Sequence, residues 1–348
     1  MSGASAMGQP GPEASEDSNV NGESTPLSSH HFIHRAMGTE FRFQVYLREG
    51  DVGRDDLALV VREAFDAIDV LEQQISSWIA SSDTSSVNKH ASDGSVRVRR
   101  DVFDLFLFSR LVYDETLGAF DVTVGPLVDV LRAADSEGGD LVTDALSRVG
   151  MHNLVLDLEE QTISFKKSGM RVDFGGIGKG LALDAAAEVL RNHGVESALL
   201  VGGDSSILAI GSPRNKQYWE IGIDNPYNEE RNFGMVYLRD EALSTSACRV
   251  TMNPIGGAVR HECDVFDPRT GALIDGMTSV TVVAPTGVLT DALSTAFFVM
   301  GTEGAREYCR KRPEVRAVLV ERDSENSPAP VYIGGFGKQH TRKQHHAE

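Results

Sequence analysis

The spacing of hydrophobic residues alternates between a period of two and a period of about 3.6, which predicts both strands and helices. Residues 40–47 alternate strictly between polar and apolar side chains, so Phe41, Phe43, Val45 and Leu47 lie on one face of a predicted strand. Residues 55–74 then place apolar side chains at helical spacing. The apolar positions of this predicted helix are Leu57, Val60, Val61, Ala64, Ile68 and Leu71.

Further segments continue this mixture of helices and strands. Predicted helices cover residues 101–115, 181–193 and 290–301, with Thr290 as the N-cap of the last; a hairpin covers 153–165; strands cover 197–201, 219–223, 235–238, 279–284 and 315–320. The strands at 219–223 and 235–238 are expected to continue the same sheet. The polar composition of 81–88 predicts a loop, and 242–248 predicts a turn.

Length and composition predict a single large unit or two closely packed subdomains. The chain has 348 residues and 41% hydrophobic residues, enough to bury a substantial core. It shows no internal repeat and no linker. Residues 1–29 are rich in Ser, Gly, Pro and Glu and are expected to be a disordered tail, residues 30–335 to be the ordered domain, and residues 336–348 to be a frayed end.

Charge narrows the classes of partner. The chain carries 33 basic and 51 acidic residues, a net charge of −18, which argues against binding nucleic acid or anionic lipid and suits a site for a divalent cation. No run of about 18 apolar residues predicts a membrane-spanning helix. No secretory signal or lipid-anchor signal is visible in the sequence, so we expect a cytoplasmic protein.

The three cysteines bear on whether the chain has disulfides or a zinc site. Cys248, Cys263 and Cys309 are too few and too scattered to predict a disulfide framework or a zinc site.

A glycine-rich turn at residues 175–180 joins a short apolar strand to a predicted helix. Backbone N–H groups at a helix N-terminus suit an anionic ligand, and glycines let phosphates approach closely. The spacing matches neither a Walker A loop nor a G-x-G-x-x-G fingerprint. Tight packing of strand against helix explains such a turn equally well, but the nearby carboxylates of Asp173 and Asp184 favour a site.

Two further features are ambiguous when taken alone. Asp291 and Thr295 are four residues apart, which puts two oxygen-bearing side chains on one helix face. Such a pair more often caps or solvates a helix than binds a metal. Trp78 could stack on an aromatic ligand, although its residue type alone favours a role as a core anchor beside the first helix.

Four segments taken together resemble the ApbE family of FAD:protein FMN transferases. The segments are Met37-Gly-Thr39, Gly118-Ala-Phe-Asp-Val-Thr-Val-Gly-Pro-Leu127, Asp173-Phe-Gly-Gly-Ile-Gly-Lys-Gly180, and Asp267-Pro-Arg-Thr-Gly271 followed by Thr290-Asp-Ala-Leu-Ser-Thr295. The resemblance extends from about residue 31 to 335. It implies an α+β fold of two intimate subdomains, with mixed sheets, flanking helices and an FAD cleft between them.

The resemblance also implies an activity, namely transfer of the FMN half of FAD to a Thr or Ser hydroxyl of a target flavoprotein, with release of AMP. It implies a Mg²⁺ site made by Asp291, Thr295 and the backbone carbonyl of Gly176, and oxygen-only ligands favour magnesium over zinc. Lys179 would neutralise phosphate charge as AMP leaves. The implied FAD-binding residues are Met37, Trp78 (here stacking on the flavin), Ala119, Phe120, Asp121, Asp173, Lys179 and the backbone at Val265.

The chain departs from the family pattern at two places. Asp264 occupies the position where the family usually has the His that activates the acceptor hydroxyl, and residues 245–248 read Thr-Ser-Ala-Cys where the family tends to have Thr-Ser-Gly-Asp. We expect Asp264 to act as the base, with His261 as the neighbouring candidate.

These departures leave two alternatives to the transferase. One is an FAD pyrophosphatase that releases FMN and AMP, and the other is a flavin-binding or flavin-delivery protein without catalysis. Family members are often exported and lipid-anchored, whereas the target of this chain is expected in the cytoplasm or on the inner membrane face. A homodimer is left open.

Overall fold

The computed structural model describes residues 29–47, 54–133, 139–228, 231–252, 259–322 and 329–336. The predicted tails at 1–29 and 336–348 lie outside these ranges, apart from Ser29 and Phe336. In this described part of the chain, no helix combines the length and apolar character that crossing a membrane requires.

The centre of the fold is an eight-stranded sheet in which every neighbouring pair of strands is antiparallel. The strand order is β1-β2-β6-β7-β10-β13-β14-β15. The strands are β1 (Ser29–Ala36), β2 (Thr39–Tyr46), β6 (Ala198–Gly202), β7 (Ser206–Ile210), β10 (Ala242–Ala247), β13 (Met277–Ala284), β14 (Arg316–Glu321) and β15 (Val331–Ile333).

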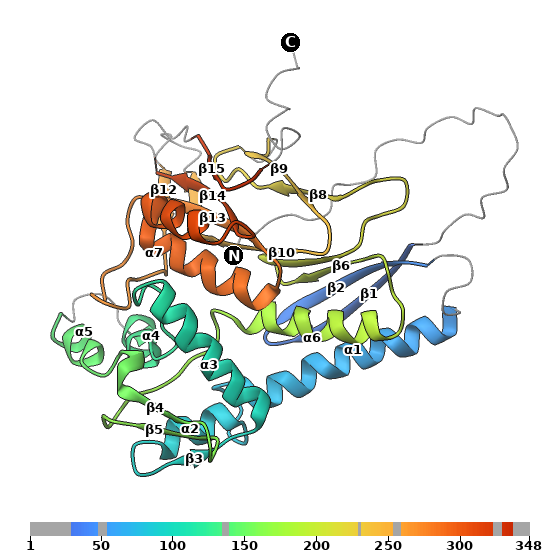
Figure 1. Ribbon diagram of the computed structural model, residues 1–348. Helices are drawn as coiled ribbons and strands as arrows, with labels where there is room; N and C mark the ends of the chain where they lie inside the picture. Colours follow the sequence, from blue (N-terminus) through green and yellow to red (C-terminus); the bar gives the residue numbers. More distant parts are fainter. Residues whose placement is uncertain are drawn as a thin grey trace, which may run out of the picture.

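Alternation along each strand divides the apolar side chains between two faces of this sheet. In β6, Ala198 and Leu200 pack toward the helices α1 (Arg54–Ile75) and α6 (Gly178–Asn192), whereas Leu199 and Val201 pack toward the other face. Figure 1 shows α1 and α6 against one face and β8 (Trp219–Ile223) and β9 (Gly234–Leu238) on the other.

The expectation that the strands at 219–223 and 235–238 continue the large sheet is wrong. Both strands form, but β8 and β9 pair with each other in a separate two-stranded sheet. Their buried side chains Trp219, Ile221 and Val236 cover the large sheet from above. Strand periodicity predicts that a face is buried, but it does not distinguish an added strand from a covering layer.

A group of smaller elements between β2 and β6 builds the lower part of the molecule in Figure 1. A three-stranded sheet in the order β3-β5-β4 packs with several helices around a core that also includes α7 (Gly287–Lys311), which is kinked at Gly301. The elements are α2 (Asp83–His90), β3 (Val96–Arg97), α3 (Arg100–Glu115), α4 (Gly125–Ala133), α5 (Gly139–Leu146), the 3-10 turn η1 (Met151–Asn153), β4 (Leu154–Asp157) and β5 (Thr162–Phe165).

Two of the expected irregular segments are regular in the structure. The predicted loop at 81–88 contains α2, because the Ser82 hydroxyl caps the helix by accepting a hydrogen bond from the Ser85 N–H at 2.9 Å. The predicted turn at 242–248 contains β10, which lies between β7 and β13. Polar composition therefore does not predict irregular structure reliably where a helix cap or two neighbouring strands provide hydrogen-bond partners for the backbone.

The helices α6 and α7 meet at their N-termini, and each supplies a carboxylate to the other. Asp184 of α6 accepts hydrogen bonds from the backbone N–H groups of Gly287 and Val288 at 2.7 and 2.8 Å. Asp291 of α7 accepts one from the Gly180 N–H at 2.6 Å. The N-cap position is Thr286 and the capping oxygens come from Asp184, so the expectation that Thr290 caps this helix is wrong.

The closeness of this crossing depends on two glycines. A Cβ atom on Gly180 would overlap the carbonyl of Gly287, and one on Gly287 would overlap the carbonyl of Gly180. Because both obstacles are backbone atoms of packed helices, rotation of a side chain cannot relieve either overlap.

Replacing Gly180 by Ala is therefore expected to lower the free energy of unfolding by about 3 kcal/mol or more, through forced separation of the two helices. Denaturant unfolding followed by circular dichroism measures the change. Gly94→Ala is the matched control, since a Cβ there meets nothing within 4 Å. Equal stability of the two variants would contradict the close backbone contact.

Candidate active site

A cleft of about 1100 Å³ opens beside the junction of α6 with the large sheet. Segments that are far apart in the sequence meet there: the turn before β2, the end of α1, the glycine-rich turn, the loop after β6, and the residues after β10 and β12 (Val259–Glu262). The site residues expected from the family pattern that line this cleft are Met37, Trp78, Asp173, Lys179, Asp264 and Val265.

The glycine-rich turn is held by side chains on both of its sides. The Asp173 carboxylate accepts a hydrogen bond from the Gly175 N–H at 2.7 Å, which fixes the bend. Before the turn, the expected short strand is reduced to an isolated bridge between Arg171 and Val124, so that expectation is wrong. The Asn88 amide of α2 both donates to the Val172 carbonyl and accepts from its N–H, at 2.9 and 2.7 Å. The turn therefore presents Gly175, Gly178 and Lys179 to the cleft at the start of α6.

Trp78 does not act as a core anchor. Its side chain is 78% exposed and lines the cleft just beyond the end of α1. The interpretation based on residue type alone is therefore wrong, because the chain turns outward after Ile75, which is the buried residue at this end of the helix. An exposed indole at a cleft wall offers a flat face to an aromatic ligand.

Asp291 lies beneath the cleft and is 4% exposed. Besides the bond from Gly180, its carboxylate accepts a hydrogen bond from the Ser206 hydroxyl at 2.8 Å. One turn further along α7, Thr295 lies 3.5 Å from the hydroxyl of Ser246, a residue that lines the cleft. Ser246 in turn lies 2.9 Å from the Ser294 hydroxyl.

This set of donors suits a hard cation. Asp291 and Thr295 offer a carboxylate and a hydroxyl, and the hydroxyls of Ser206 and Ser246 add further oxygen atoms nearby. The described residues contain no group of three His, Cys, Asp or Glu side chains that could hold a metal by themselves. Mg²⁺ is commonly bound through one or two carboxylates together with waters and substrate phosphates, so a single carboxylate among hydroxyls fits magnesium.

Ala119, Phe120 and Asp121 are buried and are not among the residues that line the cleft. The Phe120 ring packs behind the glycine-rich turn, where a Cβ on Gly176 would lie 3.7 Å from it. Phe120 therefore supports the turn from behind. The structure separates Ala119, Phe120 and Asp121 from the other FAD-binding residues expected from the family pattern.

Asp121 forms a compact hydrogen-bond network. Its Oδ1 atom accepts from the N–H and the hydroxyl of Thr123 at 2.7 and 2.6 Å, and the Thr123 hydroxyl accepts from the Gly150 N–H at 2.7 Å. Burial raises the pKa of Asp121 to about 6, and the bonds from Thr123 oppose that shift.

Asp264 and Val265 follow β12 on the opposite wall of the cleft, and Asp264 is exposed. The backbone of His261 pairs with that of Val250 in the two-stranded sheet of β11 (Arg249–Met252) and β12, and its side chain lies outside the described part of the structure. Of the two candidate bases, His261 therefore lies in β12 of this hairpin and Asp264 lies just after β12.

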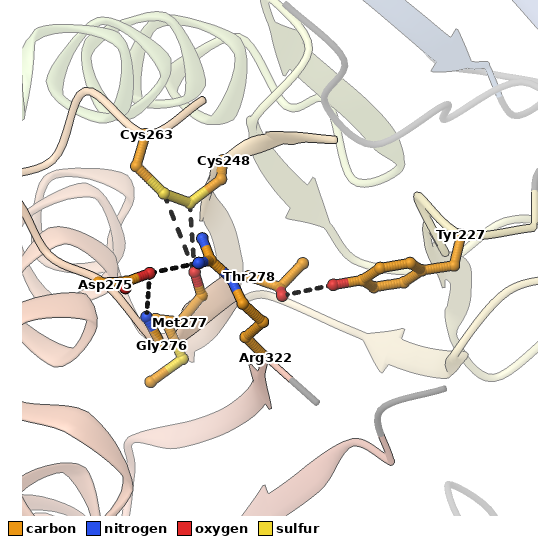
Figure 2. Close-up of a disulfide and its surroundings, with 8 residues drawn as sticks. All are labelled: Tyr227, Cys248, Cys263, Asp275, Gly276, Met277, Thr278 and Arg322. Atoms are coloured by element: carbon orange, nitrogen blue, oxygen red, sulfur yellow. Dashed lines mark hydrogen bonds and ion pairs between the residues drawn. A yellow bond between two sulfur atoms is a disulfide. The ribbon is translucent and has the colours of Figure 1, made fainter. Parts of the chain in front are cut away.

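Cys248 and Cys263 form a disulfide, as Figure 2 shows, and Cys263 directly precedes Asp264 in the sequence. The number and spacing of the three cysteines, which predict no disulfide framework, therefore did not reveal this single pair. They are 15 residues apart in the sequence, and the β11–β12 register brings them opposite each other. Cys309 is buried and free.

The charge of the cleft is unusual for a site that would hold phosphates. Among the described residues, five carboxylates line it against the two cations of Lys179 and Arg249. A pyrophosphate in such a cleft needs additional positive charge, which a divalent cation supplies. The five carboxylates belong to Glu72, Asp173, Asp204, Glu262 and Asp264.

Several residues that build the site carry no motif in the sequence. Asn88 clamps the turn, Ser206 and Ser246 surround the possible cation ligands, and Arg249 adds a cleft cation. Only Ser246 stands inside a segment compared with the family pattern. The other three become visible through strand order and helix packing.

The raised pKa of Asp121 predicts a pH-dependent stability. An ordinary Asp has a pKa of 3.8, so between about pH 4 and 6 the folded protein holds a proton that the unfolded chain has released. Its contribution to stability is therefore fully present below about pH 4 and lost as the pH rises through about 6, about 3 kcal/mol in all. Urea unfolding at pH 4.5 and 7.5 measures this contribution. The native protein should have the larger free energy of unfolding at pH 4.5 by the amount due to Asp121, and Asp121→Asn should lack that difference. Equal pH dependence in both proteins would contradict the assignment.

Curated proteins that are similar to this chain over most of its length share one name, FAD:protein FMN transferase. The FAD:protein FMN transferase of Treponema pallidum (strain Nichols) is 27% identical over 304 residues, covering 82% of this chain and 82% of that protein. The protein of the same name from Klebsiella pneumoniae (strain 342) is 26% identical over 288 residues, covering 80% of each.

Solved structures show the same fold. The ApbE protein of Thermotoga maritima superposes with a TM-score of 0.74 at 24% identity over 88% of this chain and 97% of that one. The flavin transferase ApbE of Vibrio cholerae gives 0.74 at 23% identity over 88% and 98%. The predicted α+β fold is thereby confirmed. A family model for the ApbE family matches residues 37–319, so this chain belongs to the ApbE family.

Proposed function

We propose that this protein transfers FMN from FAD to a Thr or Ser hydroxyl of a target flavoprotein and releases AMP, with Mg²⁺ as the metal cofactor. The observation that carries the proposal is the cleft. Lys179 of the glycine-rich turn and the exposed Trp78 both line it, and the Asp291–Thr295 pair lies beneath it, where Thr295 is 3.5 Å from the cleft residue Ser246. The names of the related flavin transferases support the reaction class.

The cleft suits a dinucleotide in size and chemistry. Its volume of about 1100 Å³ exceeds the ~300–1000 Å³ of ordinary small-molecule pockets. Trp78 offers a stacking surface for the isoalloxazine ring, and Met37 adds a flexible apolar contact at the turn before β2. The N-terminus of α6, with Gly178 and Lys179, is the electropositive end where a pyrophosphate is stabilised.

The reaction breaks the phosphoanhydride bond of FAD and forms a phosphoester bond to the acceptor hydroxyl. The acceptor oxygen attacks the phosphorus on the riboflavin side of FAD, the bond from that phosphorus to the bridging oxygen breaks, and AMP leaves with the electron pair. Asp264, exposed on the cleft wall, takes the proton of the hydroxyl as general base. Lys179 stabilises negative charge on the leaving phosphate.

Asp291, Thr295 and the Gly176 carbonyl would hold the cation, with Ser206 orienting the Asp291 carboxylate through its hydrogen bond. When bound, Mg²⁺ supplies charge neutralisation for the pyrophosphate. That role fits the excess of carboxylates around the cleft, which would otherwise repel the substrate.

Incubation with FAD, Mg²⁺ and a protein bearing an acceptor Thr tests the function, with AMP release and covalent flavin followed by mass spectrometry. The expected result is AMP in equal amount to a protein–FMN adduct. AMP with free FMN would instead establish a pyrophosphatase. Tight FAD binding without either product would establish a flavin-binding or flavin-delivery protein.

Asp291→Asn tests the cation site while preserving local structure. The amide oxygen can still accept from the Gly180 N–H, and the amide nitrogen can donate to the Ser206 hydroxyl. Loss of the carboxylate charge is expected to lower turnover at least about 100-fold at saturating FAD, with partial recovery at high Mg²⁺.

Asp184→Asn is the matched control for Asp291→Asn. The Asp184 carboxylate receives two backbone N–H bonds, so an amide leaves one of them unmade and lowers stability by about 1 kcal/mol. Turnover per folded molecule should persist. Undiminished turnover in Asp291→Asn would remove this residue from the cation site.

Asp264→Asn tests the general base. Transfer is expected to fall roughly 10²- to 10⁴-fold while the dissociation constant for FAD changes little, because the base acts on the acceptor and not on the flavin. Single-turnover rates and flavin fluorescence titration separate the two effects. His261→Gln is the comparison variant; a loss confined to that variant would transfer the role to His261.

A further inference from the structure

The disulfide occupies a defined position in the fold. Arg249 pairs with Glu262 in the β11–β12 register, so Cys248 and Cys263 are the next opposed pair at the base of this hairpin. Their Cα atoms are 4.5 Å apart, the separation of a non-hydrogen-bonded antiparallel pair. Residues in such a position exchange no backbone hydrogen bonds with each other. The disulfide is therefore the direct link between the two strands at Cys248 and Cys263.

The hairpin depends on this link because it receives little support from the large sheet. Among the described strands, β11 and β12 pair only with each other. A two-stranded hairpin by itself is marginally stable in water. Cys248 is fixed to β13 through its N–H, which donates to the Thr278 carbonyl at 2.9 Å, and the disulfide extends this anchorage to the returning strand at Cys263.

The same link lies in the wall of the cleft. The neighbours of the two cysteines, Ala247, Arg249, Glu262 and Asp264, all line it, and so does Cys263 itself. Cys248 is 3% exposed and lies behind Cys263. A small thiol that enters the cleft therefore meets the Sγ atom of Cys263, with Cys248 as the leaving sulfur.

We propose that Cys248–Cys263 is a thiol–disulfide exchange site. Its oxidation state determines whether the β11–β12 hairpin is well ordered, and thereby whether the cleft wall that carries Arg249 and Asp264 is well ordered. Oxidised, the link holds both strands at the large sheet. Reduced, the hairpin loses its only covalent cross-link. The effect on activity rests on the proposed function, whereas the effect on the hairpin does not.

The exchange is balanced with a thiol as reductant. A thiolate attacks Cys263 Sγ, the bond between the two Sγ atoms breaks, and Cys248 Sγ leaves with the electron pair and takes a proton. A second thiolate attacks the mixed disulfide, forms the oxidised reductant and releases Cys263. Two thiols thus supply two electrons, and a small-molecule disulfide reverses both steps.

The surroundings accommodate the reduced form. Sγ of Cys248 lies 3.2 Å from the Met277 carbonyl oxygen, within reach of a thiol donor, as Figure 2 shows. The remaining cysteine does not compete. Cys309 is buried on α7, and burial raises the pKa of its thiol to about 11, which disfavours the reactive thiolate.

Hydrogen exchange of the full-length protein tests the proposal without any assay of activity. After alkylation of thiols confirms the oxidised and reduced forms, mass spectrometry compares amide exchange in peptides covering residues 249–252 and 259–262. Reduction with a small dithiol is expected to accelerate exchange there at least about tenfold, with little change in β6 or β7. Reoxidation should restore protection. Unchanged exchange in the hairpin after reduction would overturn the proposal.

Variants separate the site from general effects of the reductant. Cys263→Ser should show the fast exchange of the reduced form under all conditions, and Cys309→Ser should retain the full redox response. If the native protein transfers FMN, reduction should also lower kcat/KM about tenfold, reversibly and only where Cys248 and Cys263 are both present. Absence of transfer in both redox states would refute the proposed function alone, because the exchange measurement still decides the redox site.

Discussion

The meeting of α6 and α7 is the interaction on which the rest of the structure depends. Two helix N-termini approach until their glycine backbones touch, and each receives a carboxylate from the other helix. Positive ends of two helix dipoles would repel each other at such a distance, so Asp184 and Asp291 compensate two partial charges at once. The two carboxylates therefore allow the helix N-termini to meet beside the cleft.

This geometry explains why one residue serves both stability and the proposed chemistry. Asp291 holds Gly180 at the start of α6 and accepts from Ser206 of β7, so it joins two helices and a strand. The same carboxylate is the one that the proposed function assigns to the cation. Cation binding would therefore act at the junction of the elements that form the site, and would not simply fill a separate pocket.

Local patterns predicted the elements well where burial follows a simple period. The alternation of Phe41, Phe43 and Val45 and the helical spacing of Val61 and Ile68 both correspond to buried faces. The family resemblance located Lys179, Trp78 and Asp264 in one cleft, although segments far apart in the chain supply them.

Features that depend on partners distant in the sequence escaped prediction. Nothing near Thr290 reveals that Asp184 supplies the capping carboxylate of that helix, and nothing near residues 81–88 reveals that Asn88 clamps Val172. The Cys248–Cys263 pair requires the hairpin register, which spacing alone does not give. Each of these contacts is set by three-dimensional proximity between polar groups, and they leave no periodic signal.

The insertion of all the smaller elements between β2 and β6 has a consequence for how the chain folds. The two strands are neighbours in the sheet, with Val45 opposite Ala198, yet α1 to α5, both strands of the β4–β5 hairpin and α6 separate them along the chain. Closing so long a loop costs entropy before the pairing gains energy. The pairing that joins β1 and β2 to the rest of the large sheet is therefore expected to form late, after the inserted elements have shortened the effective distance between β2 and β6.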